Sequence, residues 1–162
     1  MASREGRLAR RALSRREVSE RLIRKGFASE ASEREVGRLE RAGLLNDEEL
    51  ARGVCRQELT AGRGRLAIRR RLVRRSLETP VATGALAEVT EADEQGALQR
   101  ALERALRRHP GWSQDRKIRE RVVRHLLGRG FAWPAVRLAL EQRSLGFTGE
   151  LDELITDLDE GC

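Results

Sequence analysis

The sequence predicts an all-α protein, built as an elongated tandem array of three three-helix repeats followed by a short acidic C-terminal helix. Three observations lead to this fold class. Proline occurs only at positions 80, 110 and 134, and each position falls at an expected helix boundary. No window alternates β-forming apolar residues with polar ones at period two, so no sheet is expected. One short motif occurs three times along the chain.

The recurring motif predicts the repeat architecture. It reads RLIRKGF at 21–27, RLVRRSL at 71–77 and HLLGRGF at 125–131. We interpret each copy as the end of the second helix of a repeat, where an i, i+4 apolar pair packs inward, a Gly or Ser turns the chain and the next apolar residue fills the corner. The pairs are Val18 and Leu22, Ile68 and Leu72, and Val122 and Leu126, followed by Phe27, Leu77 and Phe131.

The spacing of the motif sets the expected domain organisation. The repeats are predicted at 1–44, 45–89 and 90–142, with an acidic amphipathic tail at 143–162. A three-helix unit of this size buries little by itself, so the three units are expected to stack and share a core. Because packed helices lie ~8–10 Å apart, such a stack is longer than it is wide.

Capping signals place the helices of the first half. A first helix is expected over about 3–13. Ser14 and Glu17 form a capping box that opens a helix ending at Gly26. The next helix runs from about 29 to just before 43. Asn46 or Asp47 then caps a helix with an acidic first turn, which continues to about 61.

The second half is placed in the same way. A helix over 65–75 follows the Gly-Arg-Gly break. Thr79 is expected to cap a helix that has Pro80 in its first turn and ends near 89. Thr90 and Asp93 form a second capping box, for a long helix to about 109. Ser113 is expected to cap a helix over about 115–129, and further helices are expected over 134–142 and 150–158.

The chain carries a net charge of +7, with 33 basic and 26 acidic residues, and nearly all the basic residues are arginines. The arginine bias also fits a GC-rich genome. Residues 144–162 contain six acidic residues and no basic one, so the excess positive charge lies entirely before them. Such a body is expected to attract polyanions or acidic protein surfaces.

No apolar run is long enough for a membrane span, and the two cysteines fit no metal or disulfide pattern, which favours a reduced, soluble, cytoplasmic protein.

No residues combine into a catalytic, metal or cofactor site, so we expect a protein that is not an enzyme. His109 and His125 have no Cys or carboxylate partners at metal-binding spacing. The Gly-Arg-Gly stretch at 62–64 is interpreted as a turn, because the full phosphate-loop pattern and a preceding strand are both missing. Cys55 is interpreted as a packed thiol in preference to a nucleophile.

Basic residues on helical faces are the candidate binding residues. With the apolar pairs facing the core, ~100° per residue places several cations on the opposite side of the second and third repeats. The alternative is an ordinary solvated helical face. Few aromatic residues are available for base stacking, and Trp112 and Trp133 fit either core or contact positions, so base-specific readout is not supported. The candidate residues for binding a protein filament or DNA are Arg24, Arg63, Arg70, Arg71, Arg74, Lys117, Arg121 and Arg124.

From about residue 7 to residue 143 the sequence resembles the RecX regulatory proteins. The resemblance is carried in order by LIRKGF at 22–27, GLLNDEELAR at 43–52, GRGRLAIRRRLVRRSL at 62–77 and IRERVVRHLLGRGF at 118–131. Asn46 stands where the family usually has Asp, and Leu50 where it has an aromatic residue. Ser76 replaces the usual Gly, so a tighter or less left-handed turn is expected there.

The resemblance implies a non-enzymatic modulator of the RecA recombinase. Such proteins lie along the groove of the RecA–single-stranded-DNA filament and lower its ATP hydrolysis and strand exchange. Affinity for DNA itself is a further family trait; single-stranded DNA is the expected ligand, and double-stranded DNA is left open as a second one. The rival interpretation is a general DNA-binding helical protein that acts without a recombinase. A monomer is favoured because no surplus apolar seam remains. The acidic tail could dock on the basic body, contact the filament or cover core at the end of the array.

Overall fold

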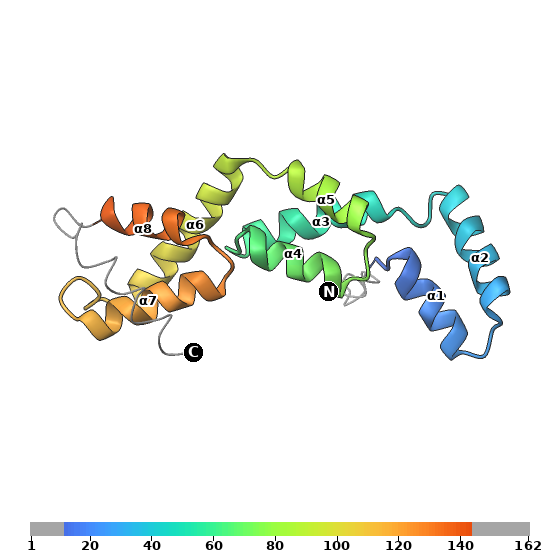
Figure 1. The fold of residues 1–162 in the computed structure, drawn as a ribbon, viewed down its shortest axis with the longest axis horizontal. Helices are drawn as coiled ribbons and strands as arrows, with labels where there is room; N and C mark the ends of the chain where they lie inside the picture. Colours follow the sequence, from blue (N-terminus) through green and yellow to red (C-terminus); the bar gives the residue numbers. More distant parts are fainter. Residues whose placement is uncertain (1–11, 144–162) are drawn as a thin grey trace, which may run out of the picture.

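The computed structural model describes residues 12–143, which form an elongated array of helices that follow one another along the long axis of the molecule (Figure 1). No strand occurs in this part of the chain. The predicted all-α, elongated fold class is confirmed. The helices are α1 Arg15–Arg24, α2 Ser29–Arg41, α3 Asp47–Thr60, α4 Arg65–Arg74, α5 Thr79–Ala87, α6 Glu91–Arg108, α7 Arg116–Gly128 and α8 Trp133–Glu141.

The helices pack in consecutive groups. Helix α3 packs against α4 and α5 around one apolar cluster, and α6 packs against α7 and α8 around another. Helices α1 and α2 form a pair at one end of the array (Figure 1). The repeat boundaries at 44/45 and 89/90 stay a prediction. The helices expected over 3–13 and 150–158 lie outside the described residues.

Side-chain caps begin several helices as expected. Ser14 and Glu17 form the predicted capping box of α1, and Thr90 and Asp93 form that of α6. The side chain of Asn46 accepts the amide of Glu49 at 2.9 Å, which confirms an Asn cap for α3.

Two predicted caps are wrong. Glu78, not Thr79, is the N-cap of α5, and it makes no side-chain capping bond. Pro80 therefore sits one residue further into the first turn, where the missing amide proton costs nothing because it would have no intrahelical acceptor. Asp115, not Ser113, caps α7, since its carboxylate accepts the amides of Lys117 and Ile118. A charged acceptor at the positive end of a helix dipole is the stronger cap.

The recurring motif is a helix C-terminal Schellman motif. In each copy the apolar residue after the turn donates its amide to the carbonyl five residues earlier, which closes the last helical turn. The N···O distances are 3.2 Å from Phe27 to Leu22, 3.4 Å from Leu77 to Leu72 and 3.5 Å from Phe131 to Leu126. The spacing from the last inward leucine to the apolar residue after the turn is therefore fixed by backbone hydrogen bonding.

The three copies are packed differently. Leu77 is 8% exposed and Phe131 is 2% exposed, as expected for residues that fill a corner. Phe27 is 54% exposed, so the expectation that it fills a corner is wrong. Helix α1 has no buried residue, and within residues 12–143 it packs mainly against α2. Within the described residues, α1 and α2 form no enclosed corner like those that receive Leu77 and Phe131 in the three-helix groups.

Ser76 adopts the left-handed conformation that glycine adopts in the other copies. Its φ is +52°, against +94° at Gly26 and +85° at Gly130. The expectation of a less left-handed turn is therefore wrong. The hydrogen bonds of the motif require this conformation whatever the side chain, and a residue with a Cβ is strained in it.

Replacing Ser76 with Gly should stabilise the protein. The substitution removes the left-handed strain, and we expect the free energy of unfolding to rise by about 0.5–1 kcal/mol. Urea denaturation followed by far-UV circular dichroism measures the change. The matched control is Ser19→Gly within α1, which should instead destabilise by about 0.5 kcal/mol through helix propensity. A neutral or destabilising Ser76→Gly would contradict the strain argument.

The middle and third groups are joined through their backbones. The amide of Gly64 donates to the carbonyl of Arg129 at 3.0 Å, and the amide of Leu66 donates to that of Gly130 at 3.2 Å. Three arginines add bonds from the third group to carbonyls at and just after the end of α3, where the helical ladder runs out of donors. Arg100 donates to Leu59, Arg104 to Ala61, and Arg129 to Ala61 and Gly62. These contacts fix α4 against α7.

A buried ion pair joins the first helix pair to the middle group. Arg75 is 5% exposed and binds the Glu17 carboxylate with Nε at 2.9 Å and Nη2 at 3.0 Å. Its Nη2 also donates to the Ala12 carbonyl. Arg75 follows the last residue of α4, just as Arg129 follows the last residue of α7. In both repeats the arginine at this position reaches back to the preceding group.

Candidate binding face

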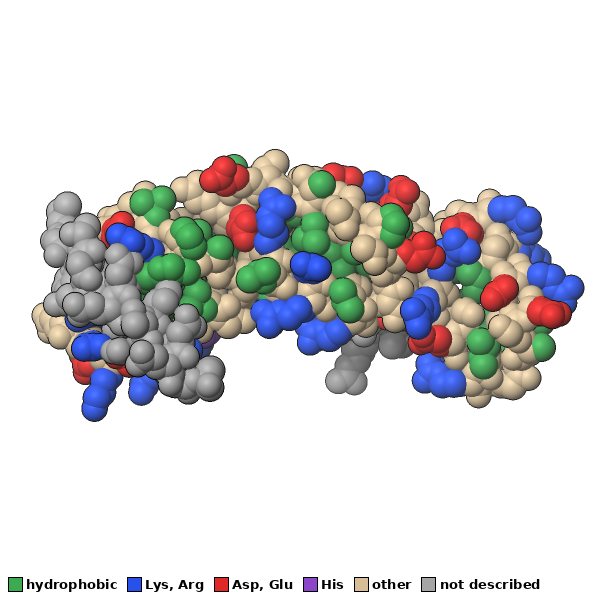
Figure 2. Space-filling model, viewed as in Figure 1, with side chains coloured by type: hydrophobic (Ala, Val, Ile, Leu, Met, Phe, Trp, Pro, Cys, Tyr) green, Lys and Arg blue, Asp and Glu red, His purple; other side chains and the backbone are tan. Residues whose placement is uncertain are grey.

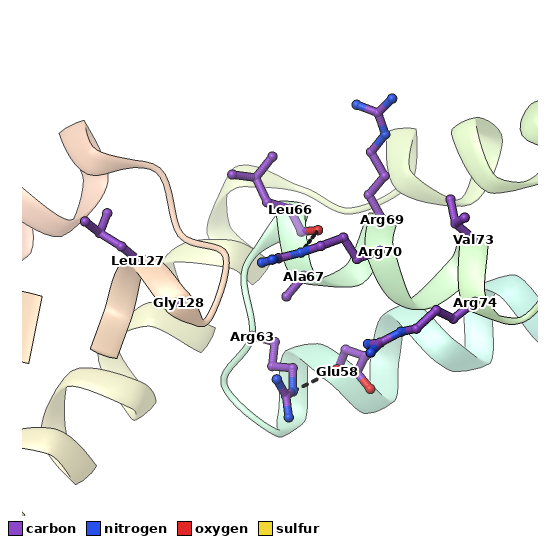
Figure 3. A pocket seen from close by; sticks show the side chains of 10 residues that line it. All are labelled: Glu58, Arg63, Leu66, Ala67, Arg69, Arg70, Val73, Arg74, Leu127 and Gly128. Atoms are coloured by element: carbon purple, nitrogen blue, oxygen red, sulfur yellow. Dashed lines mark hydrogen bonds and ion pairs between the residues drawn. The ribbon is translucent and has the colours of Figure 1, made fainter. Parts of the chain in front are cut away.

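An open groove of about 920 Å³ runs along α4 to the end of α7, and we call it the α4 groove (Figure 3). The sequence folds this way because Ile68 and Leu72 are fully buried, which turns the polar side of α4 outward. The backbone junction at Gly64 and Gly130 brings the last turn of α7 beside the start of α4. The α4 groove is lined by Glu58, Arg63, Leu66, Ala67, Arg69, Arg70, Val73, Arg74, Leu127 and Gly128.

The α4 groove is strongly basic. Glu58 is its only acidic lining residue, and this carboxylate pairs with Arg63 at 2.9 Å and Arg71 at 3.7 Å. Arg69, Arg70 and Arg74 are exposed and make no ion pair within residues 12–143. Arg70 lies along α4, with its Nε donating to the Leu66 carbonyl at 3.3 Å, while Arg69 points away from the groove floor (Figure 3).

Apolar side chains lie among these cations. Leu66 is 55% exposed and Val73 is 65% exposed, and both line the α4 groove (Figure 3). Exposed large apolar residues grouped on one face mark contact surfaces more often than chance does. The groove therefore offers guanidinium donors for carboxylate or phosphate together with apolar area for a protein surface.

A second basic row lies on α7. Lys117, Arg121 and Arg124 are exposed, and their spacing of four and three residues places them on one face of the helix. None of the three forms an ion pair with another described residue. Figure 2 shows basic side chains along the lower edge of the molecule, beneath the positions of α4 and α7 in Figure 1.

The structure thus brings together some of the predicted residues and not others. Arg63, Arg70, Arg71 and Arg74 gather around Glu58 and the α4 groove. Lys117, Arg121 and Arg124 form the separate row on α7. Arg24 is exposed on α1, at the far end of the array from α7 (Figure 1). The binding role of all eight residues stays a prediction.

Sequence reasoning missed Arg69 and a second group of basic side chains between α6 and α7. That group consists of Arg104, Arg108, His109, His125 and Arg129, which line a small crevice. The signal was present, because Arg104 and Arg108 lie four residues apart on α6, and so do His125 and Arg129 at the end of α7. What the sequence does not show is that the two faces pack together.

The other candidate residues have structural roles. Cys55 is 4% exposed, its thiol donates to the Ala85 carbonyl at 3.7 Å, and burial raises its pKa, all as expected for a packed thiol. Trp112 and Trp133 pack against the apolar cluster of the third group, which favours their core interpretation.

Within residues 12–143 no three His, Cys, Asp or Glu side chains are grouped as metal ligands. No helix in this range is long and apolar enough to cross a membrane.

Stacked helical groups define a helical-repeat protein, and its α4 groove is lined by exposed arginines. Comparison with known proteins gives the family. The model of the third three-helix domain of RecX matches residues 92–140. The regulatory protein RecX of Mycobacterium sp. (strain JLS) is 30% identical over 149 residues, which cover 88% of this chain and 79% of that protein. This chain belongs to the RecX family of regulatory proteins.

Two further relatives extend the comparison. The regulatory protein RecX of Amycolatopsis mediterranei (strain U-32) is 42% identical over 94 residues, which cover 57% of this chain and about half, 54%, of that protein. The crystal structure of RecX from Lactobacillus salivarius matches with a TM-score of 0.70 over 81% of this chain and 85% of that one. At 19% sequence identity this structural match establishes the fold.

Proposed function

We propose that this chain binds the groove of the RecA–single-stranded-DNA filament and inhibits the ATPase and strand-exchange activities of the recombinase. Membership of the RecX family supports RecA as the partner. The elongated shape supports a contact that spans neighbouring filament subunits (Figure 1). Bridging those subunits would obstruct the rearrangements that hydrolysis and strand exchange require.

The α4 groove is the observation that carries this proposal. Its arginines match both the acidic side chains of a protein surface and the phosphates of a DNA strand. Exposed Leu66 and Val73 add apolar contact area, which bare phosphate binding does not need. The proposed contact residues are Arg24, Arg63, Arg70, Arg71, Arg74, Lys117, Arg121 and Arg124, to which the groove adds Arg69.

A second candidate function is general DNA binding without a recombinase. It is favoured by the cations of α4 and α7 that make no ion pair in the described part of the chain. Binding of that kind falls steeply with salt, since each phosphate contact releases counterions, and it is indifferent to RecA. The same arginines can serve both functions, so the surface alone does not distinguish them. The two candidates are distinguished by the protein concentration needed to inhibit RecA compared with that needed to bind bare DNA.

Reversing the charges of Arg70, Arg71 and Arg74 to Glu should raise the concentration needed for half-inhibition of the RecA ATPase at least tenfold. Three attractive contacts become repulsive, while the buried face of α4 is untouched. The assay is ATP hydrolysis by RecA on single-stranded DNA, with circular dichroism to verify helicity.

The matched control reverses Arg34, Arg38 and Arg41 on α2. These residues are exposed, so the variant has the same net charge with the change placed far from the α4 groove. It should inhibit within about twofold of the natural chain, apart from long-range screening effects. Full inhibition by the α4 variant would show that the groove is not the contact.

A further inference from the structure

The crevice between α6 and α7 is small and basic. Its volume is about 60 Å³, several times the ~10–15 Å³ that one water molecule needs on the same measure, which is room for a tetrahedral anion. Helix α6 and its C-cap supply Arg104, Arg108 and His109, and the end of α7 supplies His125 and Arg129. Two small residues, Ala101 and Ala105, complete the lining.

No carboxylate lines this crevice, and Arg104, Arg108 and Arg129 form no ion pair with any residue between 12 and 143. Two of these guanidinium groups are held in place. Arg104 donates through Nε and Nη2 to the carbonyls of Arg100 and Ala61, and Arg129 donates through Nη1 to those of Ala61 and Gly62. Within residues 12–143 each retains unused N–H donors, and no hydrogen bond from the Arg108 guanidinium is found there. Pre-positioned donors without a counter-charge are what an anion site requires.

His125 is neutral in this arrangement. Its Nε2 accepts a hydrogen bond from Arg129 Nε at 3.0 Å, which a protonated ring nitrogen cannot do. The groups facing it are Arg129 on its own helix, and Arg108 and His109 at the end of α6. Burial lowers the pKa of His125 first, and the charges of these neighbours lower it further. Positive charge from the three arginines is therefore crowded here, and no carboxylate among residues 12–143 lines the crevice to offset it.

We propose that this crevice is a phosphate-binding site that holds the backbone of a nucleic acid strand continuing from the α4 groove. Arg63 connects the two, because it lines the α4 groove and directly follows Gly62, whose carbonyl accepts a hydrogen bond from Arg129 of the crevice at 3.1 Å. Phosphate is favoured over a carboxylate peptide because the lining carries three arginines and no carboxylate, and lacks the exposed large apolar residues of the α4 groove. This site depends on the proposed function in one respect only, which is that the strand it binds is the same DNA that lies in the α4 groove.

Phosphate binding here is coupled to proton uptake by His125. A bound anion favours the imidazolium form, so it raises the pKa of His125 from its lowered value in the free protein. Affinity should therefore increase as the pH falls through the pKa of the complex. It should level off below the pKa of the free protein, where His125 is already protonated in both states.

The test is binding of a fluorescent oligothymidine to the full-length chain without RecA, measured by anisotropy across a range of salt. Arg108→Gln should weaken binding about five- to tenfold, and should reduce the salt slope by about 0.7, the value for one phosphate contact on single strands. Arg107→Gln is the matched control, since Arg107 is exposed on the same helix outside the crevice and should change affinity less than twofold. Equal effects of the two substitutions would overturn the proposal.

A pH arm and a phosphate arm complete the test. Affinity for the oligonucleotide should increase between pH 7.5 and 5.5, and His125→Gln should flatten that increase. Inorganic phosphate at constant ionic strength should shift the His125 ring signals in NMR spectra. If phosphate shifts them while Arg108→Gln leaves oligonucleotide affinity unchanged, the crevice takes free phosphate and the nucleic acid site is refuted. Because RecA is absent, the outcome is independent of whether the chain inhibits the recombinase.

Discussion

Gly130→Ala is expected to destabilise the protein by about 3 kcal/mol or more. One cause is conformational, since φ is +85° and a Cβ there costs ~1–2 kcal/mol. The other cause is the junction between α4 and α7. An ideal Cβ on Gly130 would lie 2.3 Å from the amide nitrogen of Ala67 and 2.7 Å from its Cβ. Backbone cannot give way as a flexible side chain can, so α4 and α7 must separate or strain.

Gly26→Ala separates these two causes. Gly26 occupies the same position of the recurring motif with φ at +94°, and a Cβ there would meet nothing within 4 Å. It should cost only the conformational ~1–2 kcal/mol. Urea denaturation of both variants gives the difference, which measures the junction alone. Equal losses would mean that the close approach of Gly130 to Ala67 is not maintained in solution.

Arg75→Met is expected to destabilise the docking of α1 and α2 by about 3–5 kcal/mol. The substitution keeps most of the buried aliphatic volume, but it removes the guanidinium that binds Glu17 and the Ala12 carbonyl. Removing one partner of a buried pair is costly, because the Glu17 carboxylate stays partly desolvated and loses the two guanidinium donors of Arg75. Hydrogen exchange of the α1 amides reports this local docking, and denaturation reports the global effect.

The neighbouring residue supplies the control for this prediction. Arg74 is exposed and makes no ion pair in the described structure, so Arg74→Met should change the free energy of unfolding by less than about 0.5 kcal/mol. Protection of α1 amides that is equal in the Arg75 and Arg74 variants would contradict the assigned role of Arg75. The same two variants also test whether adjacent arginines of one motif have different roles, because Arg75 joins the first helix pair to the middle group while Arg74 faces solvent.

Much of the fold follows from local chemistry that can be read along the chain. The capping boxes at Ser14 and Thr90 and the cap at Asn46 depend on residues within one turn; both boxes were predicted, and Asn46 was one of the two residues predicted to cap α3. The exposure of Phe27 was not predictable, because burial depends on what the rest of the chain places over a residue. Ser76 shows the same limit, since the hydrogen bonds of its turn decide the backbone conformation against the preference of the side chain.

Some residues of the candidate site were likewise predictable from local sequence, and others were not. Helical geometry alone places Arg70 and Arg74 opposite the buried pair of α4, which is why both were predicted. The α4 groove also needs Leu127 and Gly128 from α7, and the junction that brings them there depends on two glycines far apart in sequence. The Gly-Arg-Gly stretch was interpreted only as a turn, whereas Gly64 is also needed small, since a Cβ on it would lie 2.4 Å from the carbonyl oxygen of Gly130.

The most direct test of the proposed function compares two titrations at one salt concentration. In the first, the chain is added to RecA hydrolysing ATP on single-stranded DNA, and in the second it is added to the same DNA without RecA. Contact with the assembled filament predicts half-inhibition at least tenfold below the concentration that half-saturates bare DNA, because the α4 groove then gains protein contacts as well as phosphates. Inhibition that only follows DNA occupancy, or a RecA ATPase that does not respond, would contradict it.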